Sequence, residues 1–189
     1  PYYKDAGLAV ISLAVSEIDR AAPNGTGSFK AGANYAGGLA ATRKAQELGA
    51  NVALYLDSAE HRYIPDARSA NIIIVMKDGR LVTPASSAIL PSITRRSLME
   101  LAAEHLNLDT EERPIDLRAE FGQFEEAGAC GTAAVLSPVG KIWFDNEWHN
   151  IYQDGQTVGP IMQELYDLLI GIQKGEIVDQ FSWLYEIEI

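Results

Sequence analysis

Ala70–Thr83 has the sequence ANIIIVMKDGRLVT, in which two apolar runs flank a short polar segment. Runs rich in Ile and Val favour strands because β-branched side chains pack well on a pleated surface. Gly79 can supply the positive φ that a tight turn between two strands requires. The stretch therefore predicts a β-hairpin with a buried first strand, Ala70–Met76, and a second strand, Leu81–Thr83.

Outward from this hairpin, strand-like runs alternate with helix-like runs, which is typical of a mixed α/β domain. Further strands are predicted at Leu8–Val15, Val52–Leu56, Glu112–Pro114, Ala129–Ser137 and Lys141–Phe144. Helices are predicted at Tyr35–Leu48, Ser92–Leu106, Arg118–Ala127 and Pro160–Lys174, with glycine after the end of several of them. The apolar stripe of the last helix is best explained by core packing.

The composition narrows the class of protein. Apolar residues make up 47% of the 189 positions, which is enough for a hydrophobic core, and the formal net charge is -11. Nucleic-acid binding is disfavoured because it needs clustered Lys and Arg. No apolar run approaches the roughly 18 residues that cross a bilayer, and Cys130 is the single cysteine. We expect a soluble, cytoplasmic protein that binds neither nucleic acid nor membrane.

Two further expectations come from what the sequence lacks. His61, His105 and His149 are scattered without metal-ligand spacing, so no metal site is predicted. The chain starts at Pro1 and reaches a predicted strand within a few residues, which suggests a fragment or one piece of a longer protein.

Lys30 lies in a segment of small residues, Gly25–Tyr35, with the sequence GTGSFKAGANY. Small neighbours let a flat ligand approach the amine, and a desolvated Lys becomes a nucleophile towards carbonyl groups. The segment fits neither the P-loop nor the dinucleotide-binding pattern of glycines. The alternative is a solvated Lys in a glycine-rich loop.

Two other segments predict binding of an anion by backbone N–H groups. Ile89–Arg95 (ILPSITR) ends an apolar run and begins a helix, where the free N–H groups of Ile93 and Thr94 favour a phosphate. Gly128–Ala134 (GACGTAA) combines small residues with the hydroxyl of Thr132 where a strand meets a turn. The alternatives are an ordinary Ser-capped helix and a close-packed strand.

A carboxylate precedes the first strand of the hairpin. Tyr63–Asn71 (YIPDARSAN) places Asp66 shortly before a buried strand, and a buried carboxylate needs a partner such as a protonated pyridine nitrogen. The alternative is a solvated Asp in a turn.

The order of these segments resembles the branched-chain aminotransferase family of fold-type IV pyridoxal-phosphate enzymes. The matching stretches are Lys30–Tyr35, Asp66–Asn71, Ile89–Arg95 and Thr132–Val139. Arg20–Pro23, before the lysine, also looks like a family segment, and the resemblance covers nearly all of the chain. It implies the large carboxy-terminal domain of the D-amino-acid-aminotransferase-like fold over residues 1–189, a mixed-sheet pseudo-barrel with surrounding helices. It also implies that the family's smaller amino-terminal domain is absent from this chain, so we expect this polypeptide alone to be incomplete.

The resemblance assigns roles around a pyridoxal 5'-phosphate cofactor. Lys30 matches the lysine that forms the internal aldimine and moves the substrate proton, and Tyr35 matches the tyrosine bonded to the phenolate oxygen. Asp66 stands where the family has a glutamate paired with the pyridine nitrogen, and Ser69 at a nearby hydroxyl position.

Three departures qualify the match. Asp66 is one methylene shorter than the family's glutamate, which is expected to stretch its contact to the ring nitrogen or to place a water in it. Arg68 replaces a glycine and is expected to crowd the cofactor or pair with Asp66, and Pro65 precedes the acid. The third is the missing amino-terminal domain.

The remaining roles concern anionic groups and partners. The backbones of Ile93 and Thr94, with Thr132, match the phosphate site, and the backbone of Thr132 and Ala133 matches the site of the substrate carboxylate. The implied reaction transfers the amino group between leucine, isoleucine or valine and 2-oxoglutarate, in a homodimer or larger oligomer. Open alternatives are a D-amino-acid transaminase, an aminodeoxychorismate lyase, or a non-catalytic fragment that serves as a binding or assembly module.

Overall fold

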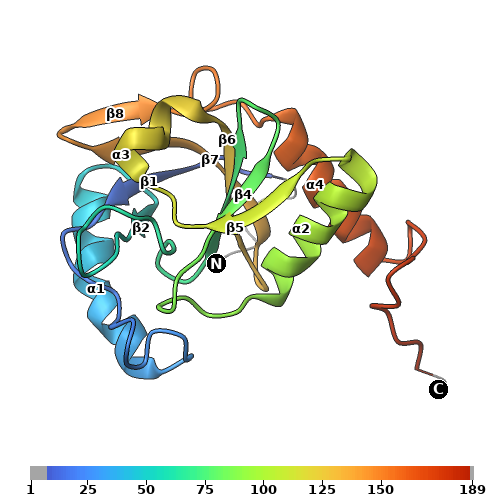
Figure 1. Cartoon of the computed structure of the whole chain (residues 1–189), viewed down its shortest axis with the longest axis horizontal. Coiled ribbons are helices and arrows are strands. Elements are labelled where there is room, and N and C mark those ends of the chain that lie inside the picture. The colour runs from blue at the N-terminus through green and yellow to red at the C-terminus, as the bar shows by residue number, and fades with distance from the viewer. Residues whose placement is uncertain (1–7, 188–189) are drawn as a thin grey trace.

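The computed structural model describes residues 8–187 and contains one mixed sheet of eight strands (Figure 1). The strand order is β2-β1-β7-β6-β3-β4-β5, and β8 pairs with β7. The pairs β1–β2, β1–β7 and β4–β5 are parallel, and the others are antiparallel. The strands are β1 (Ile11–Val15), β2 (Val52–Leu54), β3 (Asn71–Met76), β4 (Leu81–Pro84), β5 (Thr110–Arg113), β6 (Phe124–Gly131), β7 (Val135–Phe144) and β8 (Glu147–Asn150).

The helices lie around the sheet, with α1 on one side and α2 beside α4 on the other (Figure 1). They are α1 (Gly32–Glu47), α2 (Ile93–Leu106), α3 (Leu117–Glu120) and α4 (Pro160–Gln173), and a 3₁₀ turn, Phe121–Gln123, follows α3. Gly49, with φ of 80°, follows the end of α1, and Pro160 begins α4, as their positions in the sequence predict.

A short segment joins the two ends of the sheet. Leu54 of β2 forms an isolated bridge with Ala67, and Tyr63 forms another with Asp116, which follows β5. The N–H of Ile64 also donates to the carbonyl of Ile115 at 3.0 Å. Residues 63–67 therefore connect β2 to the chain beyond β5, and this connection confirms the predicted pseudo-barrel.

The hydrophobic core divides at the sheet because successive side chains of a strand point to opposite faces. Ile72, Ile74 and Met76 of β3 pack inside the curved sheet, in a cluster that also includes Leu13 and Leu54. Side chains on the other face of β3 pack against α2 and α4. This outer cluster includes Ile73, Val75, Leu98, Leu165, Leu169 and Ile172, so the apolar stripe of α4 is core packing.

The structure overturns one predicted helix. Residues 118–127 form most of the short helix α3, a 3₁₀ turn and the start of β6, which pairs with β3 and β7. Pairing with both neighbours outweighs the helical propensity of the acidic stretch. The predicted strand Ala129–Ser137 is likewise divided by a turn at 132–134, and β8 was not predicted.

Membrane-spanning helices and metal clusters are both missing from the described part of the chain. Among residues 8–187, none of the helices combines the length and apolarity needed to cross a membrane. In the same range, no three His, Cys, Asp or Glu side chains gather in a way that could hold a metal ion.

Candidate active site

A cleft of about 270 Å³ lies where the loop before α1, the segment after residue 63, the start of α2 and the β6–β7 turn meet. Its lining includes six of the residues that the sequence singled out: Lys30, Tyr35, Asp66, Ser69, Ile93 and Thr132. Thr94 and Ala133 follow two of these in the chain but do not line the cleft. The fold thus brings together residues from four segments that are far apart in the sequence.

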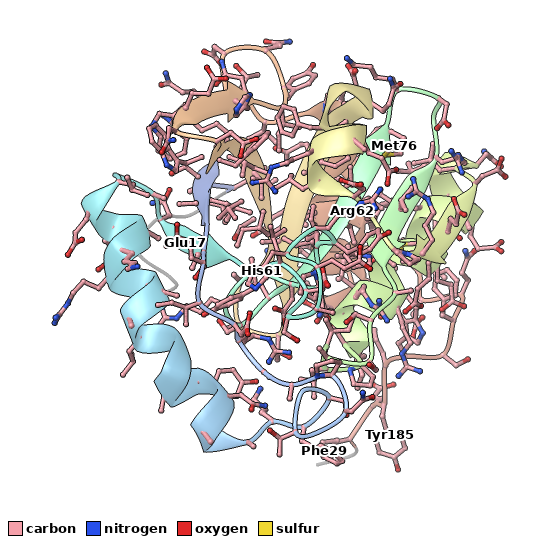
Figure 2. The ribbon with its side chains drawn as sticks, turned by 60° about the vertical axis from the view of Figure 1, so that its left-hand side comes forward. Glu17, Phe29, His61, Arg62, Met76 and Tyr185 are labelled. Carbon is pink, nitrogen blue, oxygen red and sulfur yellow. The ribbon has the colours of Figure 1, made fainter. Side chains whose placement is uncertain are left out.

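Lys30 ends a loop whose conformation is fixed by Asn34, a buried residue in the first turn of α1. The Nδ2 of Asn34 donates to the carbonyl oxygens of Thr26 and Phe29, at 2.7 and 3.0 Å, and its Oδ1 accepts from the Thr26 hydroxyl at 2.9 Å. Phe29 itself is 64% exposed, at the outer end of this loop (Figure 2). Lys30 is exposed too, but it lines the cleft.

Replacing Asn34 with alanine is expected to loosen this loop. Three hydrogen bonds are lost in a buried setting, which at about 1 kcal/mol each lowers the free energy of unfolding by roughly 2 to 3 kcal/mol. Urea unfolding measures this change, and the rate at which an aldehyde reacts with Lys30 measures the looser position of the amine. Thr42→Ala, which removes a single bond to Gly38 within α1, is the control. An unchanged reaction rate at Lys30 would contradict a positioning role.

Asp66 is buried, so the sequence-based alternative of a solvated turn Asp is wrong. Its Oδ1 lies 3.0 Å from Nε of Arg20, and both side chains are less than 10% exposed. The contact is an ion pair, and Oδ1 has no hydrogen-bond partner within residues 8–187. Burial raises the pKa of Asp66 to about 7, although Arg20 opposes the shift.

Arg20 holds several parts of the site together, and sequence reasoning gave it no role. Its Nη2 donates to the carbonyl of Gly27 at 3.1 Å and also to the carbonyl of Ala88. One guanidinium therefore connects the loop of Lys30, the acid at position 66 and the loop that leads to α2. The signal available in the sequence was Arg20-Ala21-Ala22-Pro23, which resembled a family segment but had no visible partner.

The start of α2 offers two backbone donors. Ser92 caps the helix, with its hydroxyl accepting from the N–H of Arg95 at 3.2 Å. The N–H groups of Ile93 and Thr94 donate to no acceptor within residues 8–187. Ser capping and anion binding are therefore compatible here, because the cap leaves the first two amides available.

Across the cleft, Gly131 and Thr132 stand at the turn between β6 and β7. The two strands pair as far as Gly131 and Val135, so the intervening residues project from the end of the hairpin. Thr132 is exposed at this end. The turn was predicted as a place where small residues leave backbone groups accessible, although the end of β6 and the start of β7 were predicted as one strand, Ala129–Ser137.

Arg68 does not pair with Asp66, since Arg20 takes that place. It lines the cleft, is half-buried, and has a positive φ of 41°. Its guanidinium makes no hydrogen bond or ion pair with any residue from 8 to 187. The cleft thus contains three cationic side chains, Arg20, Lys30 and Arg68, against the single carboxylate of Asp66.

An acid and an amine face one cleft beside a helix start, an arrangement that can accommodate a phosphorylated aldehyde. The model of the family "Amino-transferase class IV" matches residues 2–142. The chain belongs to this family.

Among known proteins, the chain is similar to branched-chain aminotransferases of several bacteria. The chain is 46% identical to the branched-chain-amino-acid aminotransferase of Helicobacter pylori over 170 residues, 90% of this chain and 48% of that protein. The solved branched-chain aminotransferase of Escherichia coli is 32% identical, with a TM-score of 0.82, over 97% of this chain and 58% of that one. A T.th. branched-chain aminotransferase complexed with N-(5'-phosphopyridoxyl)-L-glutamate is 26% identical, with a TM-score of 0.79, over 93% and 55%. The chain spans about half the length of the relatives it matches.

Proposed function

We propose that this chain carries the cofactor site of a pyridoxal-phosphate-dependent aminotransferase that moves an amino group between leucine, isoleucine or valine and 2-oxoglutarate. One observation carries the proposal: the amine of Lys30 lines the same cleft as the buried acid Asp66, which is paired with Arg20, and a helix start whose first amides have no acceptor within residues 8–187. The branched-chain substrates follow from the relatives, and the glutamate conjugate on the T.th. enzyme supports a dicarboxylic partner.

The residues of the cleft fit pyridoxal phosphate. Asp66 would accept from the ring nitrogen, because its carboxylate is buried, lines the cleft and has no hydrogen-bond partner at Oδ1 within residues 8–187 beside the ion pair with Arg20. The amides of Ile93 and Thr94, with Thr132, would hold the phosphate. Tyr35 would donate to the phenolate oxygen, with Ser69 nearby. When bound, the cofactor supplies an electron sink for the bond that is broken at the substrate Cα.

The protein's own groups supply the remaining chemistry. The amine of Lys30 would take the proton from the substrate Cα and return it, which is general acid–base catalysis by a group held near the reacting atom. The backbone of Thr132 and Ala133 would orient the substrate carboxylate at the end of the β6–β7 hairpin. The ionised carboxylate of Asp66 would keep the ring nitrogen protonated.

A panel of amino donors tests the assignment. The 189-residue chain with added pyridoxal phosphate is expected to convert leucine, isoleucine and valine to their 2-oxo acids, detected by chromatography in single-turnover amounts. D-Alanine and aminodeoxychorismate are the matched tests of the two alternative fold-type IV activities. Conversion of either in place of leucine would contradict the proposal. Cofactor bound to Lys30 without conversion of any donor would favour the non-catalytic binding module.

The pKa of Asp66 predicts how cofactor affinity depends on pH. Below about pH 7 the acid keeps its proton and lacks the charge that attracts a protonated ring nitrogen, so affinity should rise with pH through about 7. The limiting slope is about tenfold per pH unit. Cofactor affinity is measured by fluorescence titration across this pH range in the Lys30→Ala variant, in which no covalent link to the cofactor forms. Adding Asp66→Asn to this variant should flatten the dependence of affinity on pH. Asp19→Asn is the control and should leave it unchanged. Equal slopes in the Asp66→Asn and Asp19→Asn variants would contradict the role of Asp66.

The assembly and location of the chain are also proposals. Self-association into a homodimer or larger oligomer, or pairing with an amino-terminal segment, is supported by exposed apolar side chains. These include Phe29, Leu39, Ile93, Val178 and Tyr185. A cytoplasmic location is supported by the single buried Cys130 in the described structure. Sedimentation of the purified chain measures its oligomeric state.

A further inference from the structure

Tyr55 is a buried tyrosine whose hydroxyl has no partner in the described structure. It directly follows β2, is 1% exposed, and packs in a cluster of alanines that α1 forms with the sheet. Its hydroxyl oxygen makes no hydrogen bond with any residue from 8 to 187. A buried hydroxyl left unpaired destabilises a fold, because it loses the hydrogen bonds that water gives it. Core packing alone therefore does not explain a tyrosine here, since phenylalanine would fill the same space without that cost.

Asp66 is the residue opposite Tyr55. The antiparallel bridge between Leu54 and Ala67 places residues 55 and 66 across from each other, and the N–H of Tyr55 donates to the carbonyl of Asp66 at 3.0 Å. Side chains of opposite residues in an antiparallel pair share one face, with Cβ atoms roughly 5 Å apart. The Oδ1 of Asp66 is buried and, like the Tyr55 hydroxyl, has no hydrogen-bond partner within residues 8–187. A group that can donate and a group that can accept are therefore neighbours, and neither is in a hydrogen bond.

The surroundings keep the Tyr55 hydroxyl in its donor form. Burial raises the pKa of Tyr55, and the charge of Asp66 raises it further, while Arg20 and Arg68 oppose the shift. The phenol therefore keeps its proton at neutral pH.

Gly38 of α1 makes room for this hydroxyl. A Cβ atom at position 38 would lie 2.7 Å from the Tyr55 oxygen, which is too close for packed atoms. Gly37 is exposed, and a Cβ atom there would have nothing within 4 Å. Tyr35, which lines the cleft, lies three residues before Gly38 and so on the same side of the helix. The hydroxyl therefore lies against the part of α1 that reaches the site.

We propose that Tyr55 is a positioning residue, whose hydroxyl donates to the Asp66 carboxylate when pyridoxal phosphate occupies the cleft and so holds that carboxylate towards the ring nitrogen. One carboxylate oxygen then meets the ring nitrogen, and the protein fixes the other. Aspartate has a short side chain, so its reach depends on the direction in which its carboxylate is held. This inference rests on the proposed function, because it requires the cofactor in the cleft.

Tyr55→Phe tests the inference because it removes only the hydroxyl. Fluorescence titration of the full 189-residue chain with pyridoxal phosphate is expected to show affinity weakened roughly tenfold, since a hydrogen bond to a charged group is lost. Urea unfolding without the cofactor should show equal or higher stability, because the unpaired buried hydroxyl is gone. A purely structural role for the hydroxyl would instead lower stability without the cofactor. Tyr166→Phe, on α4 and outside the cleft, is the control and should leave affinity unchanged.

Two comparisons connect the hydroxyl with Asp66. In an Asp66→Ala chain, Tyr55→Phe should weaken binding by less than about twofold, because the coupling between two residues is lost once either partner is removed. Gly38→Ala displaces the hydroxyl, so it should weaken binding in the chain with Tyr55 but not in the Tyr55→Phe chain. Gly37→Ala is the matched control in the same helix and should weaken binding in neither.

Three outcomes would overturn the inference. They are undiminished cofactor affinity in Tyr55→Phe, an equal loss of affinity with Asp66 and with Asp66→Ala, and a loss of stability in Tyr55→Phe without the cofactor. Borohydride trapping of the cofactor on Lys30 is measured in parallel. Absence of trapping in the unchanged chain would refute the proposed function, whereas trapping with undiminished affinity in Tyr55→Phe refutes only the role of Tyr55.

Discussion

Lys30→Ala is expected to abolish covalent attachment of pyridoxal phosphate and to lower transamination by at least roughly a thousandfold. The reason is that one amine would serve both as the nucleophile towards the aldehyde and as the group that moves the substrate proton. The expected readout is peptide mapping after borohydride reduction. In the unchanged chain the label should be concentrated on Lys30, and in the variant no lysine should replace it.

Lys44→Ala is the matched control, since Lys44 lies on the exposed face of α1 and makes only a 3.8 Å ion pair with Glu17. Its label and activity should equal those of the unchanged chain. Labels spread evenly over the surface lysines, with no excess at position 30, would refute the central role of Lys30. So would a Lys30→Ala variant that keeps the spectrum of the bound cofactor.

Glu126→Ala is expected to cause the largest loss of stability, about 3 to 5 kcal/mol in the free energy of unfolding. Glu126 is a strand residue, 3% exposed, that reaches the first turn of α4. Its Oε1 accepts from the N–H of Ile161 at 3.1 Å and its Oε2 from that of Met162 at 2.8 Å. Removing the carboxylate leaves two amides without acceptors at the positive end of a helix dipole and opens a cavity.

Urea unfolding compares this variant with Glu126→Gln, which keeps the shape and one acceptor and should lose less. Gly159→Ala supplies an independent test, because a Cβ atom at this position would overlap the carboxylate of Glu126. If Glu126→Ala unfolds at the same urea concentration as the unchanged chain, the carboxylate contributes nothing as a cap for α4.

Local patterns in the sequence predicted the β3–β4 hairpin, α1, α2 and α4, because each depends on neighbouring residues: turn glycines, caps and apolar periodicity. Residues 124–127 were assigned wrongly because acidic and small residues are compatible with a helix, and only pairing with β3 and β7 makes them a strand. That pairing joins residues far apart in the chain, which single-sequence reasoning does not weigh.

The candidate site likewise combines residues that have local sequence signals with one pairing that only the folded chain creates. Lys30, Asp66, Ile93 and Thr132 each lie in a segment with its own local signal, and the cleft gathers them. The partner of Asp66 was not predictable in this way. Arg20 reaches it only because residues 63–67 close the pseudo-barrel beside the loop of Lys30, so the pair is a product of the closed fold.

The position of β1 between β2 and β7 has a consequence for synthesis of the protein on the ribosome. Ser12 pairs with Lys141, a partner made about 130 residues later, and pairings this distant in sequence form slowly. A nascent chain therefore holds β1, and the loop of Lys30 behind it, without this neighbour until β7 has emerged. During that interval β1 presents an open edge to other chains, a hazard that chaperones limit in cells.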